Sequence, residues 1–352
     1  MRHSSSDAGP SWVLGVDSGG SGVRVSLAPA DAVTGPTRSA DRTGAPATVD
    51  TSVATVAAAD RPAVTGPRGI DAASLLERVL PLVEGLMAAA GARRIAAACV
   101  GAAGMATLGD DLRDRLPDAL ADAFGVRRLA LAGDAVTAYA GALGLRPGVV
   151  VAAGTGMIAL GTSADDGGWR RADGWGHLLG DAGGGAWIGR AGLDAAMRAH
   201  DGRAGGSPAL LAAAEKQFGP LDAMPGRLYP RPDRAAVLAS FAPQVARHAG
   251  DDPVAAGILR QAARHILESA AAVRPGTGPV DVALAGGLFR TGEPLLGPLR
   301  ELAAELLPGA TLVPAAGDPL DGAVLIAGAA HHGHLTLPLD PGLLTVTDRP
   351  GA

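Results

Sequence analysis

Short apolar runs alternate with longer amphipathic segments along most of the chain. Valine- and alanine-rich runs bounded by glycine predict β-strands, which we place at residues 12–28 (two strands around a glycine turn), 93–101, 127–133, 148–163 (again two strands) and 280–287. Apolar residues spaced three and four apart predict helices, at residues 71–90, 110–124, 135–144, 184–200, 206–218, 232–249, 252–273 and 320–333. Strands that alternate with helices in this way are typical of an α/β fold.

A strand–glycine–strand pattern occurs twice, at residues 12–28 and 148–163. We interpret it as an internal repeat, which predicts two similarly built domains with a boundary near residue 145. The predicted organisation is a disordered tail, an N-terminal domain, a C-terminal domain and a C-terminal tail, at residues 1–11, 12–145, 146–335 and 336–352. The helix at 320–333 is a candidate to pack back on the N-terminal domain.

Composition excludes several kinds of partner. Apolar residues make up 47% of the 352 residues, which is typical of a globular chain. The net charge is −5 and no basic patch stands out along the sequence, so we expect no nucleic-acid partner. No uninterrupted apolar run reaches the ~20 residues of a membrane helix, and the first residues lack a hydrophobic signal core. We therefore expect a cytoplasmic protein with no membrane partner.

The single cysteine, Cys99, lies in the apolar run IAAACVG. One thiol excludes an internal disulfide and a cysteine-based zinc or iron–sulfur site within one chain. We interpret Cys99 as a buried small hydrophobic residue rather than a reactive thiol.

Four polar or glycine-rich segments lie where predicted strands end: DSGG at 17–20, Asp134, GTG at 154–156 and GG at 286–287. In open α/β sheets, ligands bind outside the carboxyl ends of the strands. Glycines at such ends let successive backbone N–H groups point at one anion, because no Cβ prevents a close approach. We therefore expect a phosphate chain to be held at these strand ends.

Six segments resemble, in the right order, the motifs of the N-acetylglucosamine kinase family. This family is grouped with the BadF/BadG/BcrA/BcrD-type ATPases in the superfamily of sugar kinases, actin and heat-shock chaperones. The segments are VDSGGSG and VVVAAGTGMIALG (phosphate motifs), LAGDAVTAYAGAL (catalytic aspartate), GWGHLLGDAGGGAWIG (sugar signature), VALAGGLF (adenosine motif) and PLDGAVLIAG (closing helix), within residues 12–328. The resemblance implies a two-domain actin-like, ribonuclease H-like ATPase fold with the active site in the interdomain cleft.

The resemblance also implies roles for single residues. Asp134 would be the general base that takes the proton of the sugar hydroxyl, and Asp17 would hold Mg²⁺ through water. The other implied contacts are to ATP at Gly19, Gly20, Ser21, Thr155, Gly156, Gly286 and Gly287, and to the sugar at Asp134, Thr155, Gly174, Trp175 and Asp181.

Phosphoryl transfer to an alcohol needs the same kinds of group for its own reasons: phosphate donors, a divalent metal and a carboxylate that accepts the proton. Lys216 is the chain's single lysine. Backbone amides and Mg²⁺ must therefore supply the positive charge around the phosphates. Asp134 precedes a predicted helix, whose N-terminus favours the ionised carboxylate that a base requires.

Three positions depart from the family pattern. Ala45, Met157 and Ala182 stand where the family commonly has a sugar-contacting asparagine, a serine and a glutamate or glutamine, respectively. These departures leave the phosphate-transfer residues intact but leave the identity of the sugar open.

Several of these residues also have a purely structural interpretation. Asp134 could cap the helix that follows it, and Asp181 could be a turn or cap residue. Trp187 fits a core position better than a sugar-stacking one. We interpret His177 as a structural residue that forms a hydrogen bond.

The predicted function is that of an ATP-dependent amino-sugar kinase that uses Mg²⁺ and phosphorylates the 6-hydroxyl of N-acetylglucosamine. Glucosamine is the nearest rival substrate. An alternative of another class is a BadF-type ATPase that acts on a protein partner, although such activators use cluster-binding cysteines that Cys99 alone cannot supply. A sugar-sensing regulator is a third alternative, but no helix-turn-helix segment precedes Trp12. The family resemblance further implies a homodimer.

Overall fold

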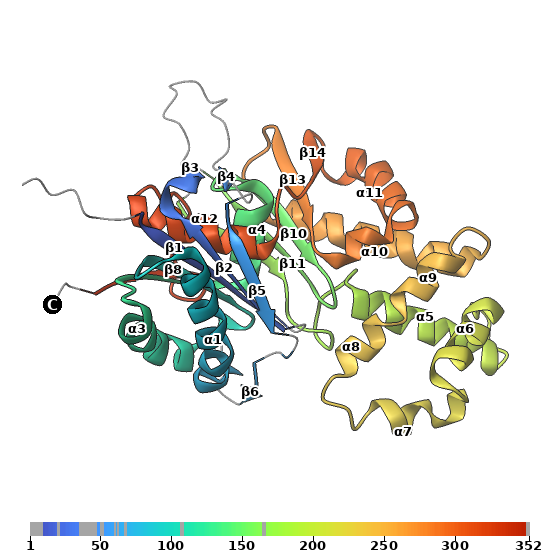
Figure 1. The fold of residues 1–352 in the computed structure, drawn as a ribbon. Coiled ribbons are helices and arrows are strands. Elements are labelled where there is room, and N and C mark those ends of the chain that lie inside the picture. The colour runs from blue at the N-terminus through green and yellow to red at the C-terminus, as the bar shows by residue number, and fades with distance from the viewer. Residues whose placement is uncertain are drawn as a thin grey trace, which may run out of the picture. The chain divides into compact units, whose positions relative to one another are not determined.

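The computed structural model of the protein shows two compact units (Figure 1). It describes residues 10–19, 22–34, 48–49, 53–59, 61, 63–66, 69–105, 109–163 and 167–349. The first unit comprises Met1–Pro147, Ser163–Trp169 and Ala315–Ala352. The second unit comprises Gly148–Thr162 and Arg170–Pro314.

A six-stranded sheet in the order β15-β9-β8-β1-β2-β5 forms the centre of the first unit. Its strands are β1 (Trp12–Gly19), β2 (Gly22–Pro29), β5 (Thr55–Ala59), β8 (Ile95–Ala102), β9 (Arg128–Gly133) and β15 (Leu344–Asp348). Strand β1 is antiparallel to β2 and parallel to β8, which is parallel to β9. The carboxyl ends of β1, β8 and β9 therefore lie at one edge of this sheet. Two short pairs lie outside it, β3 (Val33–Thr34) with β4 (Thr48–Val49) and β6 (Thr65–Gly66) with β7 (Gly69–Ile70).

Helices cover both faces of this sheet (Figure 1). They are α1 (Ala72–Ala90), α3 (Asp110–Phe124), α4 (Asp134–Leu143) and α12 (Pro319–His332). Alternate residues of β1 point to opposite faces. Leu14 and Val16 belong to the core that α1 and α3 cover, whereas Gly15 lies against Val324 of α12. Helices α1 and α3 therefore cover one face, and α12 with its neighbour α4 covers the other.

Helices α4 and α12 meet backbone to backbone. A Cβ at Gly141 of α4 would overlap the carbonyl of Asp318, and one at Gly322 of α12 would overlap the carbonyl of Thr137. Asp318 caps α12 by accepting hydrogen bonds from the N–H groups of Leu320 (2.8 Å) and Asp321 (3.1 Å). This close crossing fixes the beginning of α12 beside α4, and so places Asp318 near the residues that follow β9.

The sheet of the second unit has five strands in the order β12-β11-β10-β13-β14. They are β10 (Gly148–Ala153), β11 (Met157–Thr162), β12 (Trp169–Asp173), β13 (Val280–Ala285) and β14 (Ala310–Pro314). The remaining elements of this unit are α5 (Gly185–His200), α6 (Pro208–Phe218), α7 (Met224–Leu228), α8 (Arg234–Ala239), α9 (Ala242–His248), α10 (Pro253–Val273), α11 (Glu293–Leu306) and the 3-10 turns η2 (Leu221–Ala223) and η3 (Gly287–Thr291). The turn η1 (Ala30–Ala32) belongs to the first unit. Helices α10 and α11 pack on the sheet of the second unit, and α5 packs against α6, α8, α9 and α10.

The two sheets share one strand order. Numbered as each sheet meets them along the chain, five strands of each sheet stand in the order third, second, first, fourth, fifth. In both sheets the first two strands form an antiparallel hairpin, and the first and fourth strands are parallel. The predicted internal repeat is therefore confirmed at the level of topology, and the α/β actin-like ATPase fold class is confirmed with it.

The structure differs from the predicted elements in three ways. The segment 336–352, which we expected to be a tail, contains β15, and this strand pairs antiparallel with β9. The region predicted as one helix at 232–249 forms α8 and α9, with a break at Ser240 and Phe241. Strands β5, β12 and β14 and helix α11 were not predicted.

Cys99 is fully buried, as the sequence indicates. Among the described residues, no helix combines the length and the apolar character that a membrane crossing requires.

Candidate active site

Asp17, at the carboxyl end of β1, is held by an arginine that the sequence did not single out. Arg24 stands directly opposite Asp17 on β2. Its Nε and Nη2 donate to Oδ2 of Asp17, at 3.2 and 2.6 Å, and its Nη1 donates to Oδ2 of Asp318 at 2.5 Å. The guanidinium therefore joins the glycine hairpin of β1 and β2 to the N-terminus of α12, through charge-assisted hydrogen bonds.

Asp134 is the first residue of α4, and Gly133 is the N-cap. One carboxylate oxygen, Oδ1, accepts a hydrogen bond from the N–H of Ala135 at 2.9 Å. A side-chain cap would bond the N–H one or two positions further along the helix. The structure therefore does not give Asp134 the usual cap geometry, and its side chain is exposed to solvent at the carboxyl end of β9.

The pKa of Asp134 is raised above its ordinary value of 3.8. The main cause is the protein that crowds the carboxyl group and hinders its solvation, although solvent still touches the side chain. The bond from Ala135 lowers the pKa, and the negative charge of Asp17 raises it further. The helix N-terminus favours the ionised form as expected from the sequence, but the net shift has the opposite sign. Asp17 and Asp134 are thus close enough to interact electrostatically.

The donor set around Asp17 fits a Mg²⁺ ion held mainly by water and phosphate. Mg²⁺ prefers oxygen ligands, keeps several waters and is commonly bound through one or two carboxylates. The side chain of Asp17 is only 14% exposed, yet Arg24 occupies just one of its two oxygens in the bonds found. Within the described part of the chain, no three acidic or histidine side chains gather as a protein-only metal site.

The other first-unit positions are described only in part. Gly19 ends β1 in open space, with no atom within 4 Å of where a Cβ would lie. A ligand can therefore approach its backbone. Gly20, Ser21 and Ala45 lie outside the described residues.

In the second unit, the turn between β10 and β11 is bonded to the beginning of α5. The N–H of Gly185 donates to the carbonyl of Gly154 at 2.9 Å, and the N–H of Ala186 donates to the carbonyl of Thr155 at 2.8 Å. A Cβ at Gly185 would lie 2.6 Å from that carbonyl oxygen of Gly154, so only glycine allows this approach. The first N–H groups of α5 are therefore used by the hairpin itself. Gly154 and Thr155 remain exposed, and Gly154 has open space where a Cβ would be.

Asp181 lies directly against the same hairpin. A Cβ at Gly156 would overlap its Oδ2, and its Oδ1 accepts a hydrogen bond from the N–H of Gly176 at 3.0 Å. Burial raises the pKa of Asp181, the bonds from Gly176 and Met157 lower it, and the charge of Asp173 raises it. Asp181 also has a left-handed backbone, with φ of 54°. Such a conformation is uncommon outside glycine and is enriched at functional sites and turns.

Asp173 organises the sugar-signature loop, although nothing in the sequence distinguished it from a solvated acid. Its two carboxylate oxygens accept hydrogen bonds from the N–H groups of Asp181 (2.6 Å) and Ala182 (2.9 Å). The guanidinium of Arg171 lies 4.5 Å from the centre of the Trp175 ring and donates to the carbonyl of Gly174 at 2.6 Å. Trp175 is 65% exposed, so one face of the indole is available to a ligand.

Gly286 brings the adenosine motif next to the same turn. Its φ is 102°, and a Cβ there would overlap the carbonyl of Ala153 at the end of β10. Both features require glycine. Gly287 meets only the flexible end of Arg290 and stays exposed. The structure thus brings together Gly154–Gly156, Asp181 and Gly286 at the carboxyl ends of β10 and β13.

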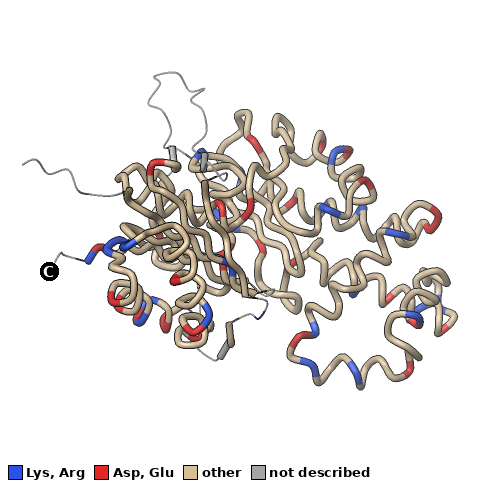
Figure 2. Tube along the Cα trace, viewed as in Figure 1, with Lys and Arg blue, Asp and Glu red and all other residues tan. Residues whose placement is uncertain are grey.

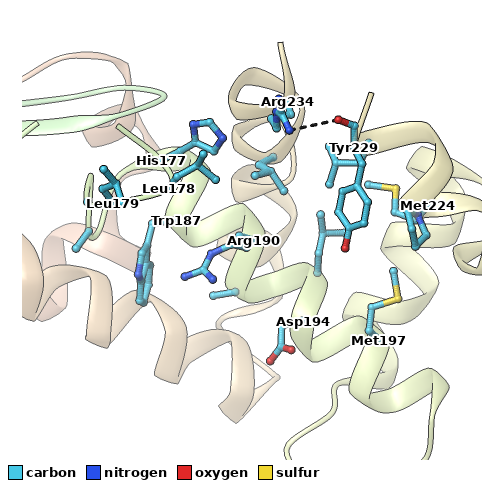
Figure 3. A pocket seen from close by; sticks show the side chains of 17 residues that line it. His177, Leu178, Leu179, Trp187, Arg190, Asp194, Met197, Met224, Tyr229 and Arg234 are labelled. Atoms are coloured by element: carbon cyan, nitrogen blue, oxygen red, sulfur yellow. Dashed lines mark hydrogen bonds between the residues drawn. The ribbon is translucent and has the colours of Figure 1, made fainter. Parts of the chain in front are cut away.

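The signature loop also borders a cavity of about 910 Å³ in the second unit (Figure 3). Its walls are mostly apolar and come from this loop and from α5, α7 and α8. In Figure 3, Arg190 and Asp194 of α5 line one wall, and Arg234 donates to the carbonyl of Tyr229 at 3.2 Å. Asp194 accepts a hydrogen bond from Arg198, whereas no bond of Arg190 occurs within the described residues.

Trp187 and His177, for which the sequence favoured structural roles, both line this cavity. Trp187 is partly buried against the core and makes an edge contact with His265, with ring centres 5.1 Å apart, and it also lines the cavity. The Nε2 atom of His177 is buried with no hydrogen-bond partner among the described residues. The predicted structural hydrogen bond is therefore not found at this nitrogen. A buried unpaired nitrogen is costly, so this edge of the cavity has an unused polar group.

Comparison with known proteins agrees with the sequence motifs. The model of the BadF/BadG/BcrA/BcrD ATPase family matches residues 14–327. An N-acetylmuramic acid/N-acetylglucosamine kinase of Clostridium acetobutylicum is 34% identical over 107 residues, and this match covers 30% of the chain and 34% of that protein. The chain thus spans about a third of the curated relative that it matches.

Two crystal structures share the fold over nearly their whole length. One is a proposed N-acetylglucosamine kinase of Chromobacterium violaceum, which is 30% identical, with a TM-score of 0.67, covering 90% of this chain and 98% of that one. The other is a proposed N-acetylglucosamine kinase of Porphyromonas gingivalis, which is 16% identical, with a TM-score of 0.63, covering 92% of this chain and 99% of that one. The second likeness shows the fold alone.

Proposed function

Because the chain belongs to the BadF/BadG/BcrA/BcrD ATPase family, we propose that it is an ATP-dependent amino-sugar kinase acting on the 6-hydroxyl of N-acetylglucosamine. The proposal rests chiefly on Asp134, an exposed carboxylate at the carboxyl end of β9 with a raised pKa. A general base works best when its pKa lies close to the working pH, and protein that hinders solvation of a carboxyl group, as at Asp134, shifts the pKa in that direction. The relatives named N-acetylglucosamine kinases support the choice of sugar.

In this proposal the two glycine hairpins bind phosphate groups. Asp17 would hold Mg²⁺ through water, and Mg²⁺, when bound, would neutralise charge on the phosphates of ATP. Gly19, Gly20 and Ser21 of the first unit, and Thr155 and Gly156 of the second, offer backbone and hydroxyl donors. Asp134 accepts the proton of the sugar hydroxyl as the phosphoryl group is transferred. Gly286 and Gly287 lie against the adenine.

The sugar signature binds the acceptor in the same proposal. Asp181 accepts a hydrogen bond from a sugar hydroxyl, and the exposed face of Trp175 lies against the ring, beside Gly174. The 2-acetamido group points toward the neighbouring cavity, where the methyl meets apolar walls. Arg190 in that cavity repels the ammonium of glucosamine and so favours the N-acetylated sugar.

The alternative of an ATPase that acts on a protein partner has less support. Cys99 is fully buried, and burial raises the pKa of its thiol, so it offers no accessible thiolate for a shared cluster. We further propose a cytoplasmic homodimer, which light scattering of the purified protein would test.

The deciding experiment measures ADP release with a panel of hexoses, hexosamines and N-acetylated hexosamines, and then locates the phosphate on the product by NMR. We expect the highest kcat/KM with N-acetylglucosamine, a 6-phosphate product and no turnover in excess chelator. A preference for glucosamine would leave the kinase proposal intact and change the substrate. ATP hydrolysis that no sugar stimulates would overturn the kinase proposal.

A further inference from the structure

A second cavity, of about 380 Å³, lies in the first unit and is lined by arginines from three separate segments. We call it the arginine cavity. Its charged lining residues are Arg94, Arg127, Arg128, Arg349, His331 and Asp348. Figure 2 shows basic segments gathered near the C-terminal end of the chain. No basic patch is visible in the sequence, because these residues are far apart along the chain.

The arginine cavity lies where β8 and β9 begin, at the opposite end of these strands from Asp134. Arg94 directly precedes β8, and Arg128 begins β9, whereas Asp134 follows the end of β9. Asp134 comes six positions after Arg128 along this extended strand, which corresponds to roughly 20 Å at about 3.3 Å per residue. A ligand in this cavity would therefore not touch the candidate catalytic residue.

Two of the arginines already have acidic partners. Arg128 is held by both carboxylate oxygens of Asp348, with its Nε at 2.5 Å and its Nη2 at 2.8 Å. Arg349 pairs with Asp118 of α3 and lies 3.9 Å from Asp122. These pairs fix two walls of the cavity and largely cancel their own charge.

The other two arginines are not neutralised. Within the described part of the chain, the guanidinium groups of Arg94 and Arg127 form no hydrogen bond or ion pair, and both residues are exposed. In a chain with a net charge of −5, two unpaired arginines on one small cavity are a local excess of positive charge. Each guanidinium presents a planar set of five N–H donors, which matches the oxygens of a phosphate.

The positive charges near the cavity affect the pKa of His331, at the end of α12. Its pKa is lowered first by burial and then by the charges of His332 and Arg128, while Asp31 raises it. A bound anion would oppose the effect of these positive charges. The imidazole of His331 is therefore a local probe for any anion that enters the cavity.

From this geometry we infer that the arginine cavity binds a small molecule bearing a phosphate monoester or free phosphate. The volume suits a metabolite, since ligand sites commonly measure about 300–1,000 Å³. A dianion can use both unpaired guanidinium groups at once, which a single carboxylate does less well. The inference does not depend on the proposed kinase activity, because binding is measured without turnover.

The test titrates the full-length protein with inorganic phosphate and, in a separate arm, with N-acetylglucosamine 6-phosphate. Calorimetry gives the affinity, and NMR follows the pKa of His331, whose signal is assigned with His331→Gln. We compare the parent with the double variant Arg94→Gln/Arg127→Gln. Arg93→Gln is the matched control, because Arg93 is exposed next to Arg94 but does not line the cavity. Glutamine keeps two of the three methylenes that Arg94 places beside Gly125, so we expect nearly unchanged melting temperatures without ligand.

We expect phosphate to raise the pKa of His331 in the parent and in the Arg93 variant but not in the double variant. Removal of two charged donors should weaken the binding at this site by about 100-fold, since each such bond is commonly worth about tenfold or more. Tighter binding of the sugar phosphate would identify an ester as the ligand, and equal affinities would identify the phosphate group alone. Phosphate that leaves the pKa of His331 unchanged would overturn the inference. Duplex DNA that binds and displaces phosphate would also overturn it, in favour of a nucleic-acid surface.

Discussion

The β1–β2 hairpin of the first unit and the β10–β11 hairpin of the second occupy the same place in two sheets of the same strand order. Their chemistry is different. The first hairpin presents Asp17 and Arg24 on facing positions, next to Asp134 and Asp318. The second presents only Gly154, Thr155 and Gly156 at its turn, and the beginning of α5 is bonded to it.

Glycines in the two equivalent hairpins are present for different reasons. Gly19 and Gly154 have open space around them, which suits a ligand that approaches the backbone. Gly156 and Gly185 are required by the protein's own packing, against Asp181 and the Gly154 carbonyl. The repeated fold therefore preserves the position of the hairpin, while the hairpin of the first unit carries an ion pair and the hairpin of the second unit is packed closely against glycine.

Of the substitutions that distinguish the two hairpins, Asp134→Asn should have the strongest effect. If the charged first unit supplies the base, the variant should lose about 10²–10⁴-fold in kcat, because loss of a general base typically costs that much. ATP affinity should change little. Steady-state ADP release and calorimetry with ATP would measure the two effects.

Asp110→Asn is the matched control for this prediction. Asp110 is also an exposed first residue of a helix after a glycine N-cap, at the beginning of α3. The control should retain parental kcat. A folded Asp134 variant with parental kcat would leave Asp134 with only a structural role.

A smaller effect is expected from Arg24, which joins three elements of the first unit. Arg24→Gln removes the bonds to Asp17 and Asp318, so Asp17 should no longer be held in one orientation. We expect kcat/KM for MgATP to fall by about tenfold, the effect of about 1.4 kcal/mol. Arg24→Lys keeps the charge but cannot bridge two carboxylates in the same plane, so it should recover only part of the loss. Full recovery with lysine would mean that charge alone matters.

The second hairpin is tested by a pair of glycine substitutions. Gly156→Ala places a methyl group on the Asp181 carboxylate and should lower the free energy of unfolding by about 1–3 kcal/mol, as overpacked sites commonly do. Gly154→Ala meets no atom within 4 Å and should leave the melting temperature nearly unchanged. Thermal melting of both variants without ligand measures the difference. Equal losses at the two positions would contradict the distinction between open and packed glycines.

The hydrophobic pattern was sufficient to predict the helices of the first unit and α10 of the second. Helix α3 was predicted with its observed bounds, and α1, α4, α10 and α12 lie within a residue or two of the prediction. The strands that were missed are short or partly exposed: β5, β12, β14 and β15 have few fully buried residues, so their alternation is weak. The β15 strand depends on pairing with β9, which no local pattern reveals.

Contacts between residues that are distant along the chain also limit how much of the site can be predicted from the sequence. The motifs indicated Asp17 and Asp181, but their partners Arg24 and Asp173 resemble ordinary solvated charges in the sequence. Arg24 could have been found from strand register, since it faces Asp17 across the hairpin. Asp318 is distant along the chain from both, and only the crossing of α4 and α12 brings it there.

A small change of stability with pH is expected from the ionisation of Asp134, because its surroundings raise the pKa of its carboxyl group. Because the folded protein raises the pKa of this carboxyl above 3.8, its ionisation costs free energy in the folded state. The parent should therefore lose stability as the pH rises from 3.8 through the folded pKa, relative to Asp134→Asn, which has no such ionisation. The difference in melting temperature, variant minus parent, should be smallest below pH 3.8 and become more positive toward neutral pH. Asp110→Asn again controls for the loss of a charge at a helix N-terminus. A difference that becomes more negative with rising pH would mean that the helix N-terminus stabilises the carboxylate more than crowding and Asp17 destabilise it.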